Sequence, residues 1–169
     1  MRYNELTFQG RNAVLEAFRS GKTIDKLFIL DGCQDGPIKS IVREAKKTDA
    51  IINYVDKERL DRLAGTGHHQ GVVAIGAAYE YAEVEDILAA AKEKGEDPFI
   101  FILDEIEDPH NLGAIIRTAN LAGAHGVIIP KRRAVGLTAT VAKTSAGAIN
   151  YTPVAKVTNI SQTIEELKK

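Results

Sequence analysis

The chain has 169 residues, enough for one domain or two small ones, and 44% of them are hydrophobic, which is typical of a globular protein. It contains no apolar run long enough to span a bilayer, and its first five residues lack the apolar core of a signal peptide. Cys33 is the only cysteine, which excludes an intrachain disulfide, so we expect a cytoplasmic location.

The net charge of −1 hides an uneven distribution of charge along the chain. Residues 1–62 carry a balance of +2, residues 63–110 carry −9, and residues 111–169 carry +6. Such asymmetry favours a polyanionic partner more than the net charge alone does. The alternative is that the acidic middle region is a solvated linker that lowers the average.

Helices and strands are expected to alternate over the first part of the chain. The predicted helices span residues 10–19, 37–47 and 57–63, and the predicted strands span residues 26–30, 51–55 and 71–75. This alternation predicts a small α/β sandwich.

Two stretches of this first part are suited to contact RNA. Residues 10–12 place a cation and an amide at a helix start, where they could meet a phosphate or an exposed base edge. Residues 65–71 form a polar, glycine-rich loop that leads into a strand, and a plain loop is the alternative. The adjacent His68 and His69 lack further ligands at metal-binding spacing, so we assign no metal site. The candidate RNA-binding residues here are Arg11, Asn12, His69 and Gln70.

The domain boundary is expected near residues 78–82, where the acidic stretch begins. We therefore predict a first domain over residues 1–78, a linker and helix over residues 79–97 with the helix at 84–94, and a second domain over residues 98–169. The second domain is predicted to contain strands at 99–103, 126–130 and 152–157, and helices at 111–122, 138–148 and 160–168. Three such strand–helix units are about half of an open, doubly wound parallel sheet, with strands buried on both faces.

Polar residues follow the first strand of this second domain. Asn111 is predicted to be the helix N-cap, beyond the carboxyl end of the strand, which is where open α/β sheets bind ligands. Gly113, Arg117 and Asn120 are four and three residues apart, so they share a stripe at the edge of the apolar face. Taken singly, Asn111 could be only a cap, Gly113 only a packing contact and Arg117 only a partner of the acidic loop 104–108. Together they indicate a functional site.

A second polar cluster follows the next strand. Lys131, Arg132 and Arg133 lie at its carboxyl end, where they could contact phosphates, with a solvated loop as the alternative. Residues 143–148 are rich in small side chains, which favours close helix packing or a loop around a ligand.

These patterns resemble a known family. The segment Asp108-Pro-His-Asn-Leu-Gly-Ala-Ile-Ile-Arg-Thr-Ala119 is similar to the first signature motif of the SpoU (TrmH-type) RNA ribose 2′-O-methyltransferases, a branch of the knotted SPOUT methyltransferases. Residues 129–136 and 143–148 also resemble this family, and residues 10–17 and 69–74 resemble its appended substrate-binding domain. The resemblance covers essentially the whole chain and is closest to the bacterial large-subunit-rRNA guanosine methyltransferases.

The resemblance implies an L30e-like α/β sandwich followed by the N-terminal part of an α/β-knot methyltransferase domain. It also implies S-adenosylmethionine as cofactor, large-subunit rRNA as substrate and a homodimer when the protein is complete. Arg117 would be the catalytic residue and Asn111 its partner. Because guanidinium is a poor base, we interpret Arg117 as stabilising the alkoxide or gripping the adjacent phosphate while Asn111 orients the ribose.

The sequence departs from the family in one respect. Such enzymes continue with a Gly-Ser-Glu-Gly loop and a Ser-Leu-Asn segment that form the knot and hold the cofactor, and neither occurs here. We therefore expect a truncated chain and assign no cofactor-binding residue. Two other hypotheses stay open: an RNA-binding protein without catalysis, and a nucleotide-binding α/β protein of another kind, which is weakened because neither common Gly-rich phosphate loop is present.

Overall fold

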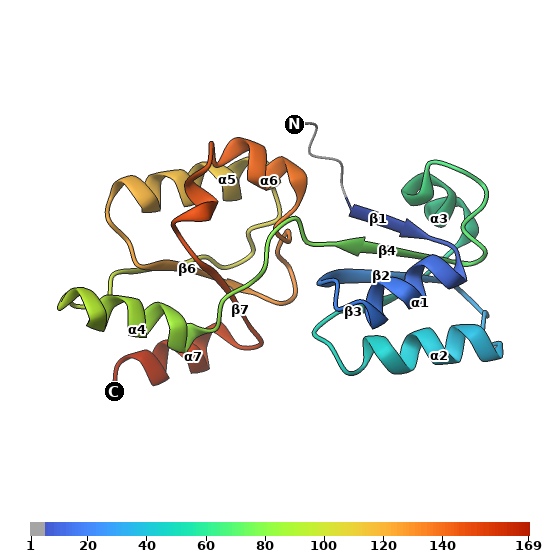
Figure 1. Cartoon of the computed structure of the whole chain (residues 1–169), viewed down its shortest axis with the longest axis horizontal. Coiled ribbons are helices and arrows are strands. Elements are labelled where there is room, and N and C mark those ends of the chain that lie inside the picture. Colours follow the sequence, from blue (N-terminus) through green and yellow to red (C-terminus); the bar gives the residue numbers. More distant parts are fainter. Residues whose placement is uncertain (1–5) are drawn as a thin grey trace. The chain divides into compact units, whose positions relative to one another are not determined.

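A computed structural model describes residues 6–169, which fall into two compact units divided between Ala77 and Ala78 (Figure 1). We refer to residues 6–77 as the N-terminal unit and to residues 78–169 as the C-terminal unit, and describe each separately.

The N-terminal unit contains a four-stranded sheet in the order β1-β4-β2-β3. Strands β2 and β3 are parallel, whereas β4 runs antiparallel to both β1 and β2. The strands are β1 (Leu6–Gln9), β2 (Ile24–Leu30), β3 (Ile51–Val55) and β4 (Val72–Gly76), and the helices are α1 (Arg11–Arg19), α2 (Gly36–Ala45) and α3 (Lys57–Ala64).

Helices cover both faces of this sheet, because side chains alternate along each buried strand. Leu27 and Ile29 of β2 pack into the cluster that holds the apolar residues of α1 and α2. Phe28, between them in sequence, packs with Leu60 of α3 on the other face. The unit is therefore a three-layer α/β sandwich, as its sequence predicts.

Strand β1 has no counterpart among the predicted strands. Its sequence, Leu-Thr-Phe-Gln, offers only two apolar residues, and its pairing partner β4 lies more than sixty positions along the chain, from Gln9↔Val73 to Leu6↔Gly76. A short strand whose stability comes from a distant partner leaves little local signal.

The C-terminal unit contains a three-stranded parallel sheet in the order β5-β6-β7. Its strands are β5 (Ile100–Ile102), β6 (Gly126–Pro130) and β7 (Val154–Val157). Its helices are α4 (Val84–Lys94), α5 (Pro109–Leu121), α6 (Ala139–Thr144) and α7 (Ile160–Leu167), with a 3₁₀ turn, η1 (Ala148–Asn150). Figure 1 shows α5 and α6 on one side of this sheet and α4 and α7 on the other.

The central strand β6 is buried along its whole length. Val127 and Ile129 pack in the cluster with residues of α5 and α6, and Ile128 packs with Ile87 of α4 on the opposite face. Strand β5 lies at the edge of the sheet and is only half-buried, and Phe99 before it is exposed. Burial on both faces was expected of all three strands and is complete only at the centre.

The predicted helix over residues 138–148 is shorter in the structure. Helix α6 ends at Thr144, and Ala146 and Gly147 have φ values of 51° and 88°, which an α-helix cannot contain. Among residues 6–169, no helix is both long and apolar enough to cross a membrane.

Residues 78–83, at the predicted domain boundary, are hydrogen-bonded to the rest of the C-terminal unit. The amide of Ala82 donates to the carbonyl oxygen of Val154 at 2.9 Å. The hydroxyl of Tyr81 accepts from the amide of Leu137 at 2.8 Å.

Candidate functional site

Helix α5 begins two residues earlier than predicted. Its N-cap is Asp108, whose Oδ1 accepts from the amides of His110 at 2.6 Å and Asn111 at 3.0 Å. The prediction that Asn111 is the cap is therefore wrong. Pro109 occupies the first helical position, where its fixed φ is suitable and its missing N–H costs nothing, so the acidic residue before it becomes the cap.

This start leaves the side chain of Asn111 free for another role. It is exposed in the first turn of α5 and has no side-chain hydrogen bond among the described residues. The backbone N–H groups of this first turn already donate to Asp108, and Pro109 has none, so the Asn111 side-chain amide is the polar group left here to contact oxygens of a ligand.

Gly113 is a packing contact between α5 and α6. A Cβ at this position would overlap Oγ1 of Thr144 and lie 2.7 Å from Cβ of Thr144, and it would be 3.0 Å from the amide of Ser145. The absence of a side chain thus lets the two helices touch. Of the two explanations for Gly113 that the sequence leaves open, packing against another segment is the one that the structure describes.

Arg117 is exposed on α5, and its guanidinium has no hydrogen-bond or ion-pair partner within residues 6–169. The acidic loop is not its partner. Six positions separate Arg117 from Asn111, which corresponds to about 9 Å of helix rise and a rotation of about 120° between the two side chains. A ligand contacted by both residues must therefore extend along the helix surface.

Asn120, the third polar residue of the predicted stripe, is turned toward the chain before β7. Its Oδ1 accepts from Oγ1 of the buried Thr152 at 3.2 Å. Asn120 thus fixes α5 against the segment that enters β7, and Arg117 is the member of the stripe left open to solvent.

The loops that follow β5 and β6 lie side by side. Nη1 of Arg133 donates to Oε1 of Glu105 at 2.7 Å, and the amide of Val135 donates to the carbonyl oxygen of Ile106 at 2.8 Å. The hydrogen bond to Glu105 raises the pKa of the Arg133 guanidinium. Arg132 is exposed and has no partner among the described residues. The predicted phosphate-binding cations are Lys131, Arg132 and Arg133. Of these, Arg133 is already paired with an acidic side chain.

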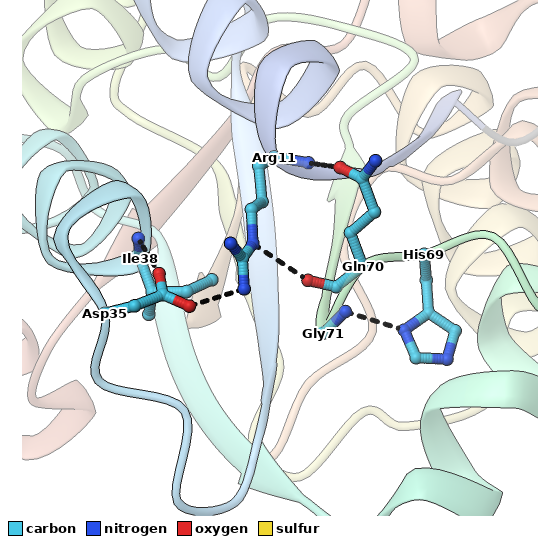
Figure 2. Close-up of polar contacts among 6 residues, drawn as sticks. All are labelled: Arg11, Asp35, Ile38, His69, Gln70 and Gly71. Atoms are coloured by element: carbon cyan, nitrogen blue, oxygen red, sulfur yellow. Dashed lines mark hydrogen bonds and ion pairs between the residues drawn. The ribbon is translucent and has the colours of Figure 1, made fainter.

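In the N-terminal unit, Arg11 joins three segments that are distant in sequence. Figure 2 shows its side chain between Asp35 and Gln70. Nε of Arg11 donates to the backbone carbonyl oxygen of Gln70 at 3.2 Å, and Nη2 forms an ion pair with Oδ2 of Asp35. The amide of Arg11 donates to Oε1 of Gln70 at 3.0 Å, so the Gln70 side chain caps α1 in place of Gly10, which has none.

His69 is part of the scaffold of this cluster. It is 5% exposed, and its Nδ1 accepts from the amide of Gly71 at 3.0 Å, as Figure 2 shows. Because Nδ1 accepts, Nε2 carries the ring proton and donates to Oδ1 of Asp61 at 2.8 Å. Both ring nitrogens are used, so we expect no direct contact between His69 and a ligand.

A shallow depression of about 610 Å³ lies beside Arg11. Among the predicted RNA-binding residues, it brings together Arg11, Asn12 and Gln70, and it excludes His69. Its walls are Arg11, Asn12, Leu30, Cys33, Pro37, Gln70 and Gly71.

Two further residues of these networks were not predicted. Asp35 is recognisable as a helix cap before Gly36-Pro37, and its Oδ1 accepts from the amide of Ile38, but its pairing with Arg11 has no local sequence signal. His125 is buried, accepts from the amide of Phe99 at 3.0 Å and lies 3.0 Å from Oε2 of Glu96, so it fixes the start of β5.

Within residues 6–169, no three His, Cys, Asp or Glu side chains are grouped to hold a metal ion.

Both units match family models. Residues 9–82 match the family described as RNA 2′-O ribose methyltransferase substrate binding, and residues 98–169 match the SpoU rRNA Methylase family.

Similar proteins carry related names. A Bacillus subtilis protein named "Putative TrmH family tRNA/rRNA methyltransferase YacO" is 54% identical over 160 residues, which are 95% of this chain and 64% of that protein. A Staphylococcus haemolyticus protein with the same family name is 48% identical over 165 residues, 98% of this chain and 66% of that protein. The chain thus spans slightly less than two thirds of the length of these relatives.

Among solved structures, an AdoMet-bound rRNA methyltransferase from Sinorhizobium meliloti is 23% identical, with a TM-score of 0.44 over 96% of this chain and 58% of that one. The two family models together match residues 9–82 and 98–169, and by these matches the chain belongs to the SpoU/TrmH family of RNA methyltransferases.

Proposed function

We propose that the protein transfers a methyl group from S-adenosylmethionine to the 2′-hydroxyl of a ribose in RNA. The observation that carries this proposal is the exposed Arg117 on α5, which has no partner within residues 6–169 and lies in the unit that matches the SpoU methylase model. The resemblance favours a guanosine of large-subunit rRNA as the target. We further propose that the protein acts in the cytoplasm as a homodimer.

In the proposed reaction the ribose oxygen would attack the methyl carbon in line, so that the O–C bond forms as the C–S bond of the sulfonium breaks and S-adenosylhomocysteine leaves. The hydroxyl proton would pass to solvent, and negative charge develops on the oxygen as it is lost. S-adenosylmethionine supplies a methyl group activated by its sulfonium. A guanidinium keeps its protons, so Arg117 is suited to donate hydrogen bonds to the developing alkoxide or to the neighbouring phosphate. Asn111, about 9 Å away along the helix, would orient the ribose through its free amide.

At the carboxyl end of the sheet, Glu105 is paired with Arg133, and the amide of Val135 donates to the carbonyl oxygen of Ile106. Among residues 6–169, no buried side-chain nitrogen or oxygen lacks a hydrogen-bond partner. We assign no cofactor-binding residue in this chain.

The N-terminal unit would hold the RNA. In the depression at Arg11, the guanidinium is held by Gln70 and Asp35, which lowers the entropic cost of ordering it on binding, while the ion pair with Asp35 offsets part of its charge. The donors that these bonds do not use, together with the amide of Asn12, could contact a phosphate or an exposed base edge. Arg132 of the C-terminal unit would add a phosphate contact.

The second candidate function is RNA binding without methyl transfer. It is favoured because no cofactor-binding residue is assigned in this chain. One experiment separates the two: incubation of the full-length protein with methyl-labelled S-adenosylmethionine and with ribosomal RNA or transfer RNA. Labelled RNA whose modified linkages resist alkaline hydrolysis would identify ribose methylation. RNA binding with no label incorporated would favour the second candidate.

A further inference from the structure

A second groove in the N-terminal unit is lined by cations and one aromatic ring. Lys39 and Arg43 of α2 and Lys46, the C-cap residue of this helix, are four and three residues apart, so they follow one stripe, and all three are exposed. Opposite them is Tyr54 of β3, at the edge of the sheet, with 55% of its surface exposed. The groove encloses about 380 Å³, and its apolar floor includes Ile38 and Val42.

The charge of this groove has one sign. None of its lining residues is acidic, and no hydrogen bond or ion pair within residues 6–169 occupies Lys39, Arg43 or Lys46. The neighbouring acid of α2, Glu44, is bonded to Lys47 at 2.9 Å, which lowers the pKa of Glu44, and the charges of Arg19 and Arg43 lower it further. The groove is therefore complementary to a polyanion.

We propose that this groove binds a single-stranded segment of the RNA, with one base stacked on Tyr54 and the flanking phosphates on Lys39, Arg43 and Lys46. An exposed aromatic ring beside a row of cations is the combination that single strands require, because each base has a face to stack and each phosphate a charge. Bases of a duplex are already stacked and do not offer that face. The inference rests on the proposed function in taking RNA as the ligand.

The groove and the depression at Arg11 are separate hollows that share one lining residue. Cys33 lines both, and Gln34 follows it on the groove side. A strand held at Arg11 can thus pass over Cys33 and reach Tyr54 without leaving the surface of the unit. The proposed RNA contact thus extends from the depression at Arg11 to the groove lined by Lys39, Arg43, Lys46 and Tyr54.

Binding of short fluorescent oligonucleotides to the 169-residue chain tests the inference. Tyr54→Ala should weaken binding of a single-stranded RNA by about 5- to 100-fold, the range of one base–aromatic stack, and should change the affinity for a hairpin stem much less. Tyr54→Phe should retain the affinity. The control is Tyr151→Ala, which removes a more exposed ring from the C-terminal unit.

A spectroscopic measurement isolates the stack. The chain has five tyrosines and no tryptophan, so its tyrosine emission is not masked. Single-stranded RNA should quench part of that emission in the wild type, and this part should be missing in Tyr54→Phe although the RNA is still bound.

The cations are tested by the dependence of affinity on salt. Replacing Lys39, Arg43 and Lys46 together by Ala should lower the salt slope for single-stranded RNA by about 2. The control replaces Lys57, Arg59 and Arg62 of α3 by Ala. These cations share their helix with the acidic Glu58 and Asp61, so they do not form a surface of one charge sign.

Unchanged affinity, quenching and slope in the Tyr54 and triple variants would overturn the inference and leave the proposed function standing. Failure of every RNA to bind the wild-type chain at low salt would overturn both. A change of oligomeric state in Tyr54→Ala, with RNA affinity unchanged, would instead assign the face to a second copy of the chain.

Discussion

Arg133 and Glu105 form an ion pair that joins the loop after β6 to the loop after β5, with 2.7 Å between Nη1 and Oε1. Both side chains are largely exposed, so the pair contributes little to folding stability. The pair should weaken the attraction of RNA to this loop, because Glu105 partly neutralises Arg133, one of the three cations at residues 131–133.

We therefore expect these cations to contribute unequally. Arg132→Ala should lower the salt slope of RNA binding by about 0.7 to 0.9, the contribution of one phosphate contact, and Arg133→Ala should lower it less. Glu105→Gln should release Arg133 and raise the affinity at low salt. Binding titrations between ~50 and ~200 mM salt measure these slopes. Equal losses in Arg132→Ala and Arg133→Ala would show that the ion pair does not persist against RNA.

Gly113 should tolerate no side chain. Gly113→Ala places a Cβ against Thr144 and should destabilise the C-terminal unit by about 1–3 kcal/mol, the usual cost of overpacking. Urea unfolding measures the change. Gly36→Ala is the control, because a Cβ at Gly36 meets no atom within 4 Å. If Gly113→Ala unfolds at the wild-type denaturant concentration, α5 and α6 do not pack as described.

Replacing His69 should lower the folding stability, because we expect His69 to support the fold and not to contact RNA directly. His69→Ala removes the acceptor of the Gly71 amide and the donor to Asp61, and the loss should be about 1–3 kcal/mol. Thermal unfolding reports this loss, and ¹⁵N chemical shifts of the imidazole in the wild type should show the proton on Nε2. A variant with wild-type stability and a reduced salt slope would instead make His69 a direct RNA contact.

The 169-residue chain should bind S-adenosylmethionine poorly, because no described residue is assigned to the cofactor. Isothermal titration calorimetry of the folded chain should give no saturation in the low-micromolar range, with a titration of ATP as the control for nonspecific nucleotide binding. Low-micromolar binding specific to S-adenosylmethionine would contradict this expectation and would require a cofactor site within these residues.

The sequence predicts the well-bounded elements of the fold closely. Helix α4 and strand β6 have the expected bounds, 84–94 and 126–130, because each is an apolar pattern bracketed by glycine or by charged residues. The start of α5 was misplaced, since Asp108 and Asn111 are both good caps and Pro109 decides between them.

The contacts that shape the candidate sites could not be predicted in this way. Arg11 meets Asp35 across 24 positions, and Glu105 meets Arg133 across 28. Such pairs are brought together by the sheets, so they cannot be predicted from local patterns of spacing and charge. The sequence thus indicates Arg11, Arg117 and residues 131–133 as candidates, and the structure shows which of them have partners.

The most direct test of the account is the rate of methyl transfer to RNA by full-length protein carrying Arg117→Ala. Arg117 is exposed and unpartnered, so the variant should fold normally and bind RNA and S-adenosylmethionine nearly as the wild type does. Its rate should fall by on the order of 10²–10³, the cost of losing one donor to a developing oxyanion. Arg117→Lys should restore little of this rate, because an ammonium lacks the planar fork of the guanidinium. Lys92→Ala, which removes an exposed cation of α4, is the control. A wild-type rate in Arg117→Ala would contradict the central claim that this guanidinium acts at the ribose.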